Sequence, residues 1–575
     1  MLLHVGRALR LPLALLAILL PRPLSAQVAA PDDPRVDSIF AAWDRPGSPG
    51  CALGVYRDGA MVYGRGYGMA DLEHGVPIMP HTMFDLGSTS KQFAAASILL
   101  LAQQGKLTLD DDVRRHVPEL PAYSRPITIR HLLHHTSGLR DYIGLLTLSG
   151  KRFDDVTTPE DALAILARQQ QLNFEPGTEH LYSNSGYFLL SLIVERAAGT
   201  SLRDFARTHI FTPLGMERTH YLGSYSDIVP DRAIGYSRRD GNLHSDVPRW
   251  LQLGDGAVWT TVEELQRWDE NFYHGQVGGP ELLAALQTPG TLADGEALRY
   301  ALGLMTGEHR GQRTISHGGS WGGYRAELLR FPDQHFSVAT LCNLSSINPS
   351  QLALQVADVL LADVLAPAPA PVAAAPAATL AARPETAPVS VPEATLRALA
   401  GAWRDTTTRA TLFLAFEAGR LYVTSPARYD LRAVSASEYE LVGPPVRVAL
   451  SFEPADGARR LRLQVEDREP QWYERQEPVT IGTADLPGYA GTFTSDELQV
   501  TWSITVQDGE LALHATGGEE RTLRPVVRDE FAAGSWTVRF RRSDDGGVAG
   551  FLLDVGRARG IGFERTAPPP ALPAR

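Results

Sequence analysis

The chain has 575 residues, more than one hydrophobic core of ordinary size contains, so we expect two to four domains. Hydrophobic residues make up 44% and charged residues 21% of the sequence, a balance that excludes wholesale disorder. The net charge is −12 and no block of lysine and arginine occurs, which argues against nucleic acid as a partner.

Residues 1–26 have the pattern of an export signal. Arg7 and Arg10 supply a positive start, residues 11–20 form an apolar stretch, and small residues precede a cleavage point before Gln27. The alternative is a membrane anchor, but the apolar stretch is short for a bilayer span, and no other run is long enough to cross a bilayer. We therefore expect a mature protein that is periplasmic or secreted and has no stable membrane span.

Residues 31–365 are expected to form one mixed α/β unit. The run at 51–68 alternates around Asp58-Gly59, a β-hairpin signal, and Thr261 and Glu264 are spaced as a helix capping box. Three strand-like runs and a final helix then complete the unit, at 311–319, 324–331, 335–344 and 350–365.

The chain has two cysteines, Cys51 and Cys342, and both stand in strand-like runs. Export would permit a disulfide, but two cysteines do not make a disulfide framework. We expect both to be buried free thiols.

Composition changes abruptly at Ala366, where a Pro/Ala-rich segment predicts a stiff linker over residues 366–392. Beyond the linker the sequence is rich in strand patterns and contains an internal repeat. Gly401 matches Gly491 and Gly419 matches Gly509, both with an offset of 90 residues.

Each copy of the repeat holds several short strands separated by turns, with no helix pattern. We therefore expect two small antiparallel β-barrels, over residues 393–480 and 481–567, rather than one larger barrel of two halves. The last residues, 568–575, are expected to form a disordered tail.

The stretch from residue 84 to 107 predicts a helix that ends near Gly105. Ser88 stands at the expected N-cap, and Lys91 stands three residues later, where a helix start favours acidic residues. Only three of the 54 basic residues are lysines, and the arginines cannot in practice give up a proton. A lysine here, on the same helix face as Ser88, indicates a nucleophilic hydroxyl beside an amine that accepts its proton. The alternative is an ordinary serine cap beside a solvated lysine.

Two later segments carry polar residues that each have a purely structural explanation. Tyr182 and Asn184 precede an apolar helix, which Asn184 or Ser185 would cap. His317 and Gly319 lie in a glycine-rich strand end, as expected where another backbone comes close. The order of these segments after Ser88 and Lys91 nevertheless favours a shared function.

Together, Ser88-x-x-Lys91, Tyr182-x-Asn184 and His317-x-Gly319 resemble the three motifs of the serine β-lactamase and penicillin-binding-protein superfamily. The likeness is greatest to class C β-lactamases, D-aminopeptidases and related esterases, and it covers roughly residues 35 to 365. It implies a β-lactamase/transpeptidase-like α/β (α+β) domain: an antiparallel sheet flanked by helices, beside a helical subdomain. A catalytic unit followed by two barrels also resembles the D-aminopeptidase arrangement.

The chemistry that this resemblance implies is acyl transfer, with no metal or other cofactor. Ser88 would attack a carbonyl, and Lys91 and Tyr182 would together transfer its proton. The sequence does not decide which of the two is formally the base. Asn184 would hydrogen-bond Lys91 or the substrate amide, and the backbone N–H groups of Ser88 and Ser320 would hold the oxyanion. The partner is then a small-molecule or peptide substrate, while the oligomeric state stays open.

The third motif departs from the Lys-Thr-Gly that β-lactamases of the superfamily commonly carry. His317 is mostly neutral near pH 7 and Gly318 has no side chain, so the usual carboxylate-binding groups are lost or weakened. This predicts poor β-lactam hydrolysis and substrates without a carboxylate at that point, such as esters or D-amino acid amides. Arg325 or another arginine could restore the charge. The histidines within residues 131–135 are interpreted as structural rather than as a metal site.

The sequence thus predicts an exported serine hydrolase that forms an acyl-enzyme at Ser88. It would hydrolyse amide or ester bonds of small peptides or D-amino acid derivatives, as a D-aminopeptidase or a DD-peptidase-like enzyme does. A carboxylesterase is the alternative within the superfamily. A non-catalytic sensor of cell-wall fragments is the alternative from another class, and the intact Ser88, Lys91 and Tyr182 argue against it.

Overall fold

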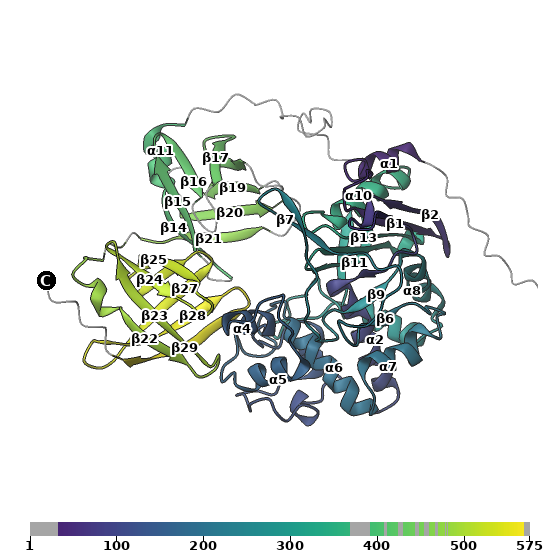
Figure 1. Cartoon of the computed structure of the whole chain (residues 1–575), viewed down its shortest axis with the longest axis horizontal. Coiled ribbons are helices and arrows are strands. Elements are labelled where there is room, and N and C mark those ends of the chain that lie inside the picture. The colour runs from purple at the N-terminus through teal and green to yellow at the C-terminus, as the bar shows by residue number, and fades with distance from the viewer. Residues whose placement is uncertain are drawn as a thin grey trace, which may run out of the picture.

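The computed structural model describes residues 33–367 and 391–567, apart from gaps at 408–410, 424–428, 443–447, 454–458, 466–469, 478 and 480. It contains a mixed α/β unit followed by two β-barrels (Figure 1). The expected export signal, most of the Pro/Ala linker and the expected tail lie outside the described residues. Among the described residues, no helix is both long and apolar enough to cross a membrane.

A six-stranded antiparallel sheet in the order β10-β11-β12-β13-β1-β2 forms the centre of the α/β unit. Asp58 and Gly59 form the predicted hairpin turn between the first two strands, both with positive φ (50° and 77°). The three later strand-like runs are likewise confirmed. The strands are β1 (Cys51–Arg57), β2 (Ala60–Tyr67), β10 (Met305–His309), β11 (Gln312–Trp321), β12 (Tyr324–Phe331) and β13 (Phe336–Cys342).

Helices cover both faces of this sheet. On one face, α1 (Pro34–Phe40) and α10 (Pro349–Leu360) pack together over a separate apolar cluster. On the other face, α8 (Val262–His274) packs on β1, β2 and β13. Thr261 caps α8 as expected by accepting from the Glu264 N–H at 3.0 Å, but the Glu264 carboxylate binds elsewhere and does not return the bond.

The helical subdomain stands beside the sheet, with α2 (Lys91–Gln103) packed against α6 (Asn184–Ala198) at its centre. The sheet, its covering helices and this subdomain confirm the predicted fold class. The other helices are α3 (Ile129–Leu133), α4 (Tyr142–Leu148), α5 (Pro159–Ala167), α7 (Leu202–Ala206) and α9 (Gly279–Gln287), with short turns η1 (Gly87–Ser90), η2 (Val113–Arg115), η3 (Arg207–Phe211) and η4 (Pro332–Gln334). Small sheets contain β3 (Met69–Asp71), β4 (Val76–Pro77), β5 (Phe84–Asp85), β6 (His220–Tyr221), β7 (Tyr236–Arg239), β8 (Asn242–Ser245) and β9 (Val258–Thr260).

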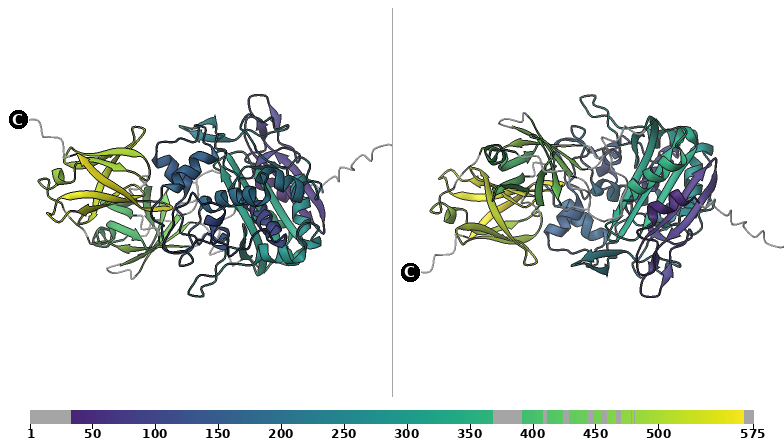
Figure 2. Two further views of the ribbon diagram at one scale, coloured as in Figure 1. Left: turned by 90° about the horizontal axis from the view of Figure 1, so that it is seen from below. Right: turned by 90° about the horizontal axis from the view of Figure 1, so that it is seen from above.

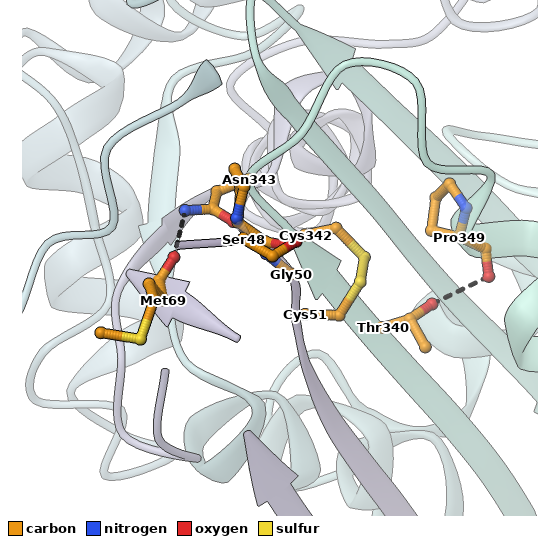
Figure 3. Close-up of a disulfide and its surroundings, with 9 residues drawn as sticks. Ser48, Gly50, Cys51, Met69, Thr340, Cys342, Asn343 and Pro349 are labelled. Atoms are coloured by element: carbon orange, nitrogen blue, oxygen red, sulfur yellow. Dashed lines mark hydrogen bonds between the residues drawn. A yellow bond between two sulfur atoms is a disulfide. The ribbon is translucent and has the colours of Figure 1, made fainter. Parts of the chain in front are cut away.

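The two cysteines form a disulfide, so the prediction of free thiols is wrong (Figure 3). Cys51 and Cys342 lie directly opposite each other where β1 pairs with β13, with Cα atoms 4.0 Å apart. The two residues are 291 positions apart in the chain, so only the strand register brings them together. Next to the bond, Asn343 accepts from the Gly50 N–H at 2.8 Å and donates to the Met69 carbonyl, which ties the strand ends together.

Two closed eight-stranded antiparallel barrels follow, as the repeat predicts. The matched glycines occupy equivalent positions: Gly401 and Gly491 begin the first strand of each barrel, while Gly419 and Gly509 sit in tight turns with φ of 78° and 80°. The first barrel comprises β14 (Gly401–Asp405), β15 (Thr411–Glu417), β16 (Arg420–Val423), β17 (Tyr429–Ala433), β18 (Glu438–Val442), β19 (Val448–Glu453), β20 (Arg460–Val465) and β21 (Gln471–Arg475). The second comprises β22 (Gly491–Ser495), β23 (Val500–Gln507), β24 (Glu510–His514), β25 (Glu520–Val527), β26 (Glu530–Ala533), β27 (Trp536–Arg542), β28 (Val548–Val555) and β29 (Ala558–Ala567).

The expectation that the repeat holds no helix is wrong in detail. A short helix, α11 (Glu393–Leu399), precedes the first barrel, and a 3₁₀ turn, η5 (Leu486–Gly488), precedes the second. Two turns of helix are too short to produce a recognisable hydrophobic period.

The second barrel is docked on the helical subdomain, and both barrels lie on the side of the molecule away from β2 (Figure 2). Arg140, whose side chain is wholly buried, makes the central contact. It donates to the Glu497 carboxylate at 2.8 Å and to the carbonyl oxygens of Arg559 and Gly560, both at 2.9 Å. The apolar core of the second barrel is continuous with that of the α/β unit, whereas the first barrel has its own core.

Reduction of the disulfide is expected to destabilise the α/β unit by about 2–5 kcal/mol, because the bond closes a very long loop in the unfolded chain. Urea denaturation with and without dithiothreitol measures this difference. The double variant Cys51→Ala/Cys342→Ala should match the reduced protein and not respond to the reductant. Two thiols titrating in the denatured, unreduced protein would contradict the assignment.

Candidate active site

Ser88 lies in the 3₁₀ turn η1, immediately before α2 begins at Lys91. It is therefore not the helix N-cap: Ser90 holds that position, and its side chain makes no capping bond. The turn is pressed against β11. A Cβ atom on Gly87, which has a φ of 49°, would come within 2.7 Å of the Ser320 nitrogen, so only glycine fits there.

Lys91 is completely buried, and its ammonium group is surrounded by oxygen atoms. Nζ lies 3.1 Å from Ser88 Oγ, 3.0 Å from Asn184 Oδ1 and 2.7 Å from the carbonyl oxygen of Asp255. These three partners match the three N–H donors of a lysine. The expected contact between Lys91 and Asn184 is thus present.

Tyr182 contacts Lys91 through its ring rather than through its hydroxyl. The Lys91 Nζ lies 4.9 Å from the ring centroid. Among the described residues, the buried Tyr182 hydroxyl has no hydrogen-bond partner. A buried polar atom without a partner is costly, so this hydroxyl is available to a group that enters the site. The structure brings the two expected proton-transfer residues together without a hydrogen bond between them.

His317 is buried on β11 and is held in one neutral form. Its Nδ1–H donates to the Gly318 carbonyl at 2.6 Å, and its Nε2 accepts from the Tyr300 hydroxyl at 3.0 Å. Burial, and then the positive charge of Lys91, lowers the pKa of His317 to about 3. The residue therefore supplies no positive charge near neutral pH.

The strand that carries His317 lies tightly against the turn that carries Ser88. Thr89 Oγ1 donates to the His317 carbonyl at 2.9 Å. A Cβ atom on Gly319 would come within 1.8 Å of the Leu86 carbonyl oxygen, so glycine is required by close backbone approach. Ser88 and Ser320 line the same cleft as a result.

Asp141 is a site residue that the sequence analysis missed. Its Oδ2 atom accepts from the Asn184 backbone N–H at 2.8 Å and from the Asn184 side-chain Nδ2 at 3.0 Å. Because these bonds fix the amide group, Asn184 Oδ1 faces Lys91. Asn184 begins α6 and Ser185 donates to the Arg140 carbonyl, so neither caps that helix.

Asp255 is the second missed residue. It lies in the loop before β9 and is buried, and its Oδ2 accepts from the Tyr142 hydroxyl at 2.9 Å. Burial raises the pKa of the Asp255 carboxyl to about 7, and the charge of Lys91 partly opposes that rise. No motif surrounds this residue in the sequence, and its role comes from contacts made only in the fold.

The cleft around Ser88 has a volume of about 1830 Å³ and three walls. The first carries Ser88, Tyr182, Asn184 and His317. The second is aromatic: Phe153 stacks on Trp250 and meets Trp321 edge to face, with ring centroids 5.1 and 5.7 Å apart. The third comes from the second barrel and consists of Thr516, Gly517, Glu519 and Arg557.

The histidines of the 131–135 segment have structural partners. His134 Nδ1 lies 3.4 Å from the Tyr300 carbonyl, and His135 Nδ1 accepts from the Ser183 backbone N–H at 3.2 Å. Burial lowers the pKa of both histidines, in His134 to about 4. In the part of the chain that the structure describes, no three His, Cys, Asp or Glu residues are grouped as a metal site.

The family model described as Beta-lactamase matches residues 36–363. Penicillin-binding protein 4* of Bacillus subtilis is 32% identical to this chain over 306 residues. The match covers 50% of this chain and 66% of that protein, which is just under two thirds of the length of the Bacillus protein. The D-aminopeptidase of Brucella anthropi is 26% identical over 541 residues, which covers 90% of this chain and 96% of that protein. The solved structure of the octameric penicillin-binding protein homologue from Pyrococcus abyssi shares the fold, with a TM-score of 0.54 and 22% identity over 77% of this chain and all of that one.

The raised pKa of Asp255 predicts a pH-dependent stability. The folded-state pKa of about 7 exceeds the unfolded value near 4. The contribution of Asp255 to the free energy of unfolding is therefore greatest below about pH 4, and it declines as the pH rises through 7. The Asp255→Asn variant should lack this decline. Its free energy of unfolding should therefore rise relative to that of the wild type, by up to about 4 kcal/mol, between pH 4 and pH 7. Urea denaturation across the pH range measures it. Exposed Asp544 provides the matched control, Asp544→Asn, and parallel curves for Asp255→Asn and wild type would refute the prediction.

Proposed function

Because this chain belongs to the beta-lactamase family, we propose that it is a serine hydrolase in which Ser88 forms an acyl-enzyme. The observation that carries the proposal is the hydrogen bond from the buried Lys91 to Ser88 Oγ, at 3.1 Å. An amine at that distance, once it has lost its own proton, can accept the hydroxyl proton as the oxygen attacks.

The reaction would proceed in two steps. In the first, Ser88 Oγ bonds to the substrate carbonyl carbon while the hydroxyl proton of Ser88 passes to Lys91 or Tyr182. The bond from that carbon to the amine or alcohol then breaks, and the leaving group takes up the proton. In the second, a water molecule adds to the acyl carbon and releases the acid, and the proton of that water returns to Ser88. The N–H groups of Ser88 and Ser320 would stabilise the negative oxygen in both steps, and losing one such donor typically costs about 3 kcal/mol.

We propose small peptides or amides with an N-terminal D-amino acid as the substrates. Support comes from the similarity to a D-aminopeptidase, which extends through the α/β unit and into the barrels. The neutral His317 and the bare Gly318 also argue against the charge-assisted binding used by β-lactamases. A carboxylesterase would share the same nucleophile, and the choice of substrate separates the two.

We further propose that the protein acts outside the cytoplasm. The pattern of residues 1–26 supports this location, and so does the Cys51–Cys342 disulfide, because such bonds persist in oxidising compartments.

Hydrolysis of D-alanyl p-nitroanilide is expected, with the L-isomer inert and Ser88→Ala inactive. A short-chain aryl ester measured in parallel tests the alternative. Turnover of the ester alone would indicate an esterase whose cleft has no specific site for an amine. Turnover of neither substrate, with Ser88 unlabelled by a serine-reactive phosphonate, would contradict the hydrolase itself.

Lys91→Arg should lower kcat by at least about 10²-fold, because the guanidinium keeps the positive charge but cannot accept the serine proton. The matched control is Lys106→Arg, an exposed position just beyond α2, which should keep the wild-type rate. Equal rates for Lys91→Arg and wild type would remove Lys91 from the proton transfer.

A further inference from the structure

A hairpin of the second barrel reaches the cleft at Arg557. Gly556 and Arg557 form the turn between β28 and β29, and the turn is anchored through its backbone. The Arg557 carbonyl accepts from the Asp141 N–H at 3.2 Å and from Asn173 Nδ2 at 2.9 Å. Two residues on, the Arg559 N–H donates to Asn173 Oδ1 at 2.8 Å. The backbone of Arg557 is therefore fixed at the edge of the site.

The guanidinium group of Arg557 faces the residues around Ser88. It lies over the Tyr182 ring, 4.7 Å from the centroid, and it lines the same cleft as Ser88. Its side chain is 45% exposed, so solvent or a ligand reaches it. Arg557 and Lys91 both contact the Tyr182 ring. The Tyr182 side chain therefore connects Arg557 to the proposed base, Lys91.

The charge of Arg557 is only loosely paired within the protein. Its Nη1 lies 3.6 Å from Asp141 Oδ2, beyond the usual range of a hydrogen bond, and this is its only ion pair among the described residues. Asp141 already accepts from Asn184 through Oδ2 and from the Ile143 N–H through Oδ1. Arg557 therefore keeps N–H donors free for a ligand in the cleft.

Two other candidates at the third motif, His317 and Arg325, are less suited to this role. His317 is neutral, and Arg325 uses its Nη1 on the backbone carbonyls of Gly322 and Tyr324. A guanidinium presents parallel N–H groups that match the two oxygens of a carboxylate.

We infer that Arg557 binds a carboxylate carried by the substrate, in place of the positive charge missing from the third motif. The inference rests on the proposed function and adds to its substrate class a preference for short peptides with a free carboxylate beyond the scissile bond. The unpartnered Tyr182 hydroxyl beside the arginine offers the ligand an additional hydrogen bond.

The test compares D-alanylglycine with D-alanylglycinamide, which differ only in a carboxylate and a neutral amide. Calorimetry in the Ser88→Ala background measures binding without turnover. We expect the carboxylate ligand to bind about tenfold more tightly, the effect of one partly exposed charge-assisted contact. Adding Arg557→Gln should bring the ratio of the two dissociation constants close to one. Adding Arg559→Gln, on the same hairpin but paired with Glu179, should leave the ratio unchanged and so controls for the docking of the barrel.

Three results would overturn the inference: equal binding of the two ligands to the Ser88→Ala protein, an unchanged ratio after Arg557→Gln, or loss of the preference only after Arg325→Gln. The second of these results includes an equal loss of affinity for both ligands in the Arg557→Gln protein, because such a loss leaves the ratio unchanged. Hydrolysis of both peptides by the protein with Ser88 intact tests the proposed function separately. A carboxylate preference without hydrolysis would reject that function and keep the binding site.

Discussion

A lysine side chain removed entirely from water is the constraint around which the site is built. Burying an ammonium group is costly unless each of its N–H donors finds an acceptor. Lys91 finds its acceptors on three separate segments: Ser88 in the turn before α2, Asn184 at the start of α6, and the Asp255 carbonyl in the loop before β9. These segments must hold their relative positions, because displacing any one of them leaves a buried charge short of a partner.

The same requirement extends outward through residues that never touch Lys91. Asp141 fixes the amide of Asn184, and the Asp141 backbone N–H in turn binds the carbonyl of Arg557 at the tip of a barrel hairpin. Neighbouring Arg140 holds the second barrel through a buried ion pair with Glu497. Docking of the barrel and orientation of the lysine thus depend on two consecutive residues. The second barrel also shares its apolar core with the α/β unit, whereas the first barrel does not.

Local patterns in the sequence are enough to predict the hairpin at Asp58-Gly59, the later strands, the duplicated barrels and the grouping of Ser88 with Lys91, because each depends on turn chemistry, periodicity or spacing. Contacts that depend on the tertiary structure cannot be predicted from such local patterns. The Cys51–Cys342 bond follows from strand register, and Asp255 reaches Lys91 through a loop with no motif of its own. Ser88 also shows a limit of capping rules: the 3₁₀ turn moves the helix N-cap by two residues, from the expected Ser88 to Ser90, since Gly87 lets the backbone pack on β11.

The position of Arg557 along the chain has a consequence for biosynthesis. It lies 469 residues after Ser88, in the hairpin that completes the second barrel. During translation the α/β unit emerges first with its serine and lysine, but the cleft stays open on one side until the second barrel has been made. Late assembly of this wall couples the mature shape of the site to the folding of a domain encoded far downstream of the nucleophile.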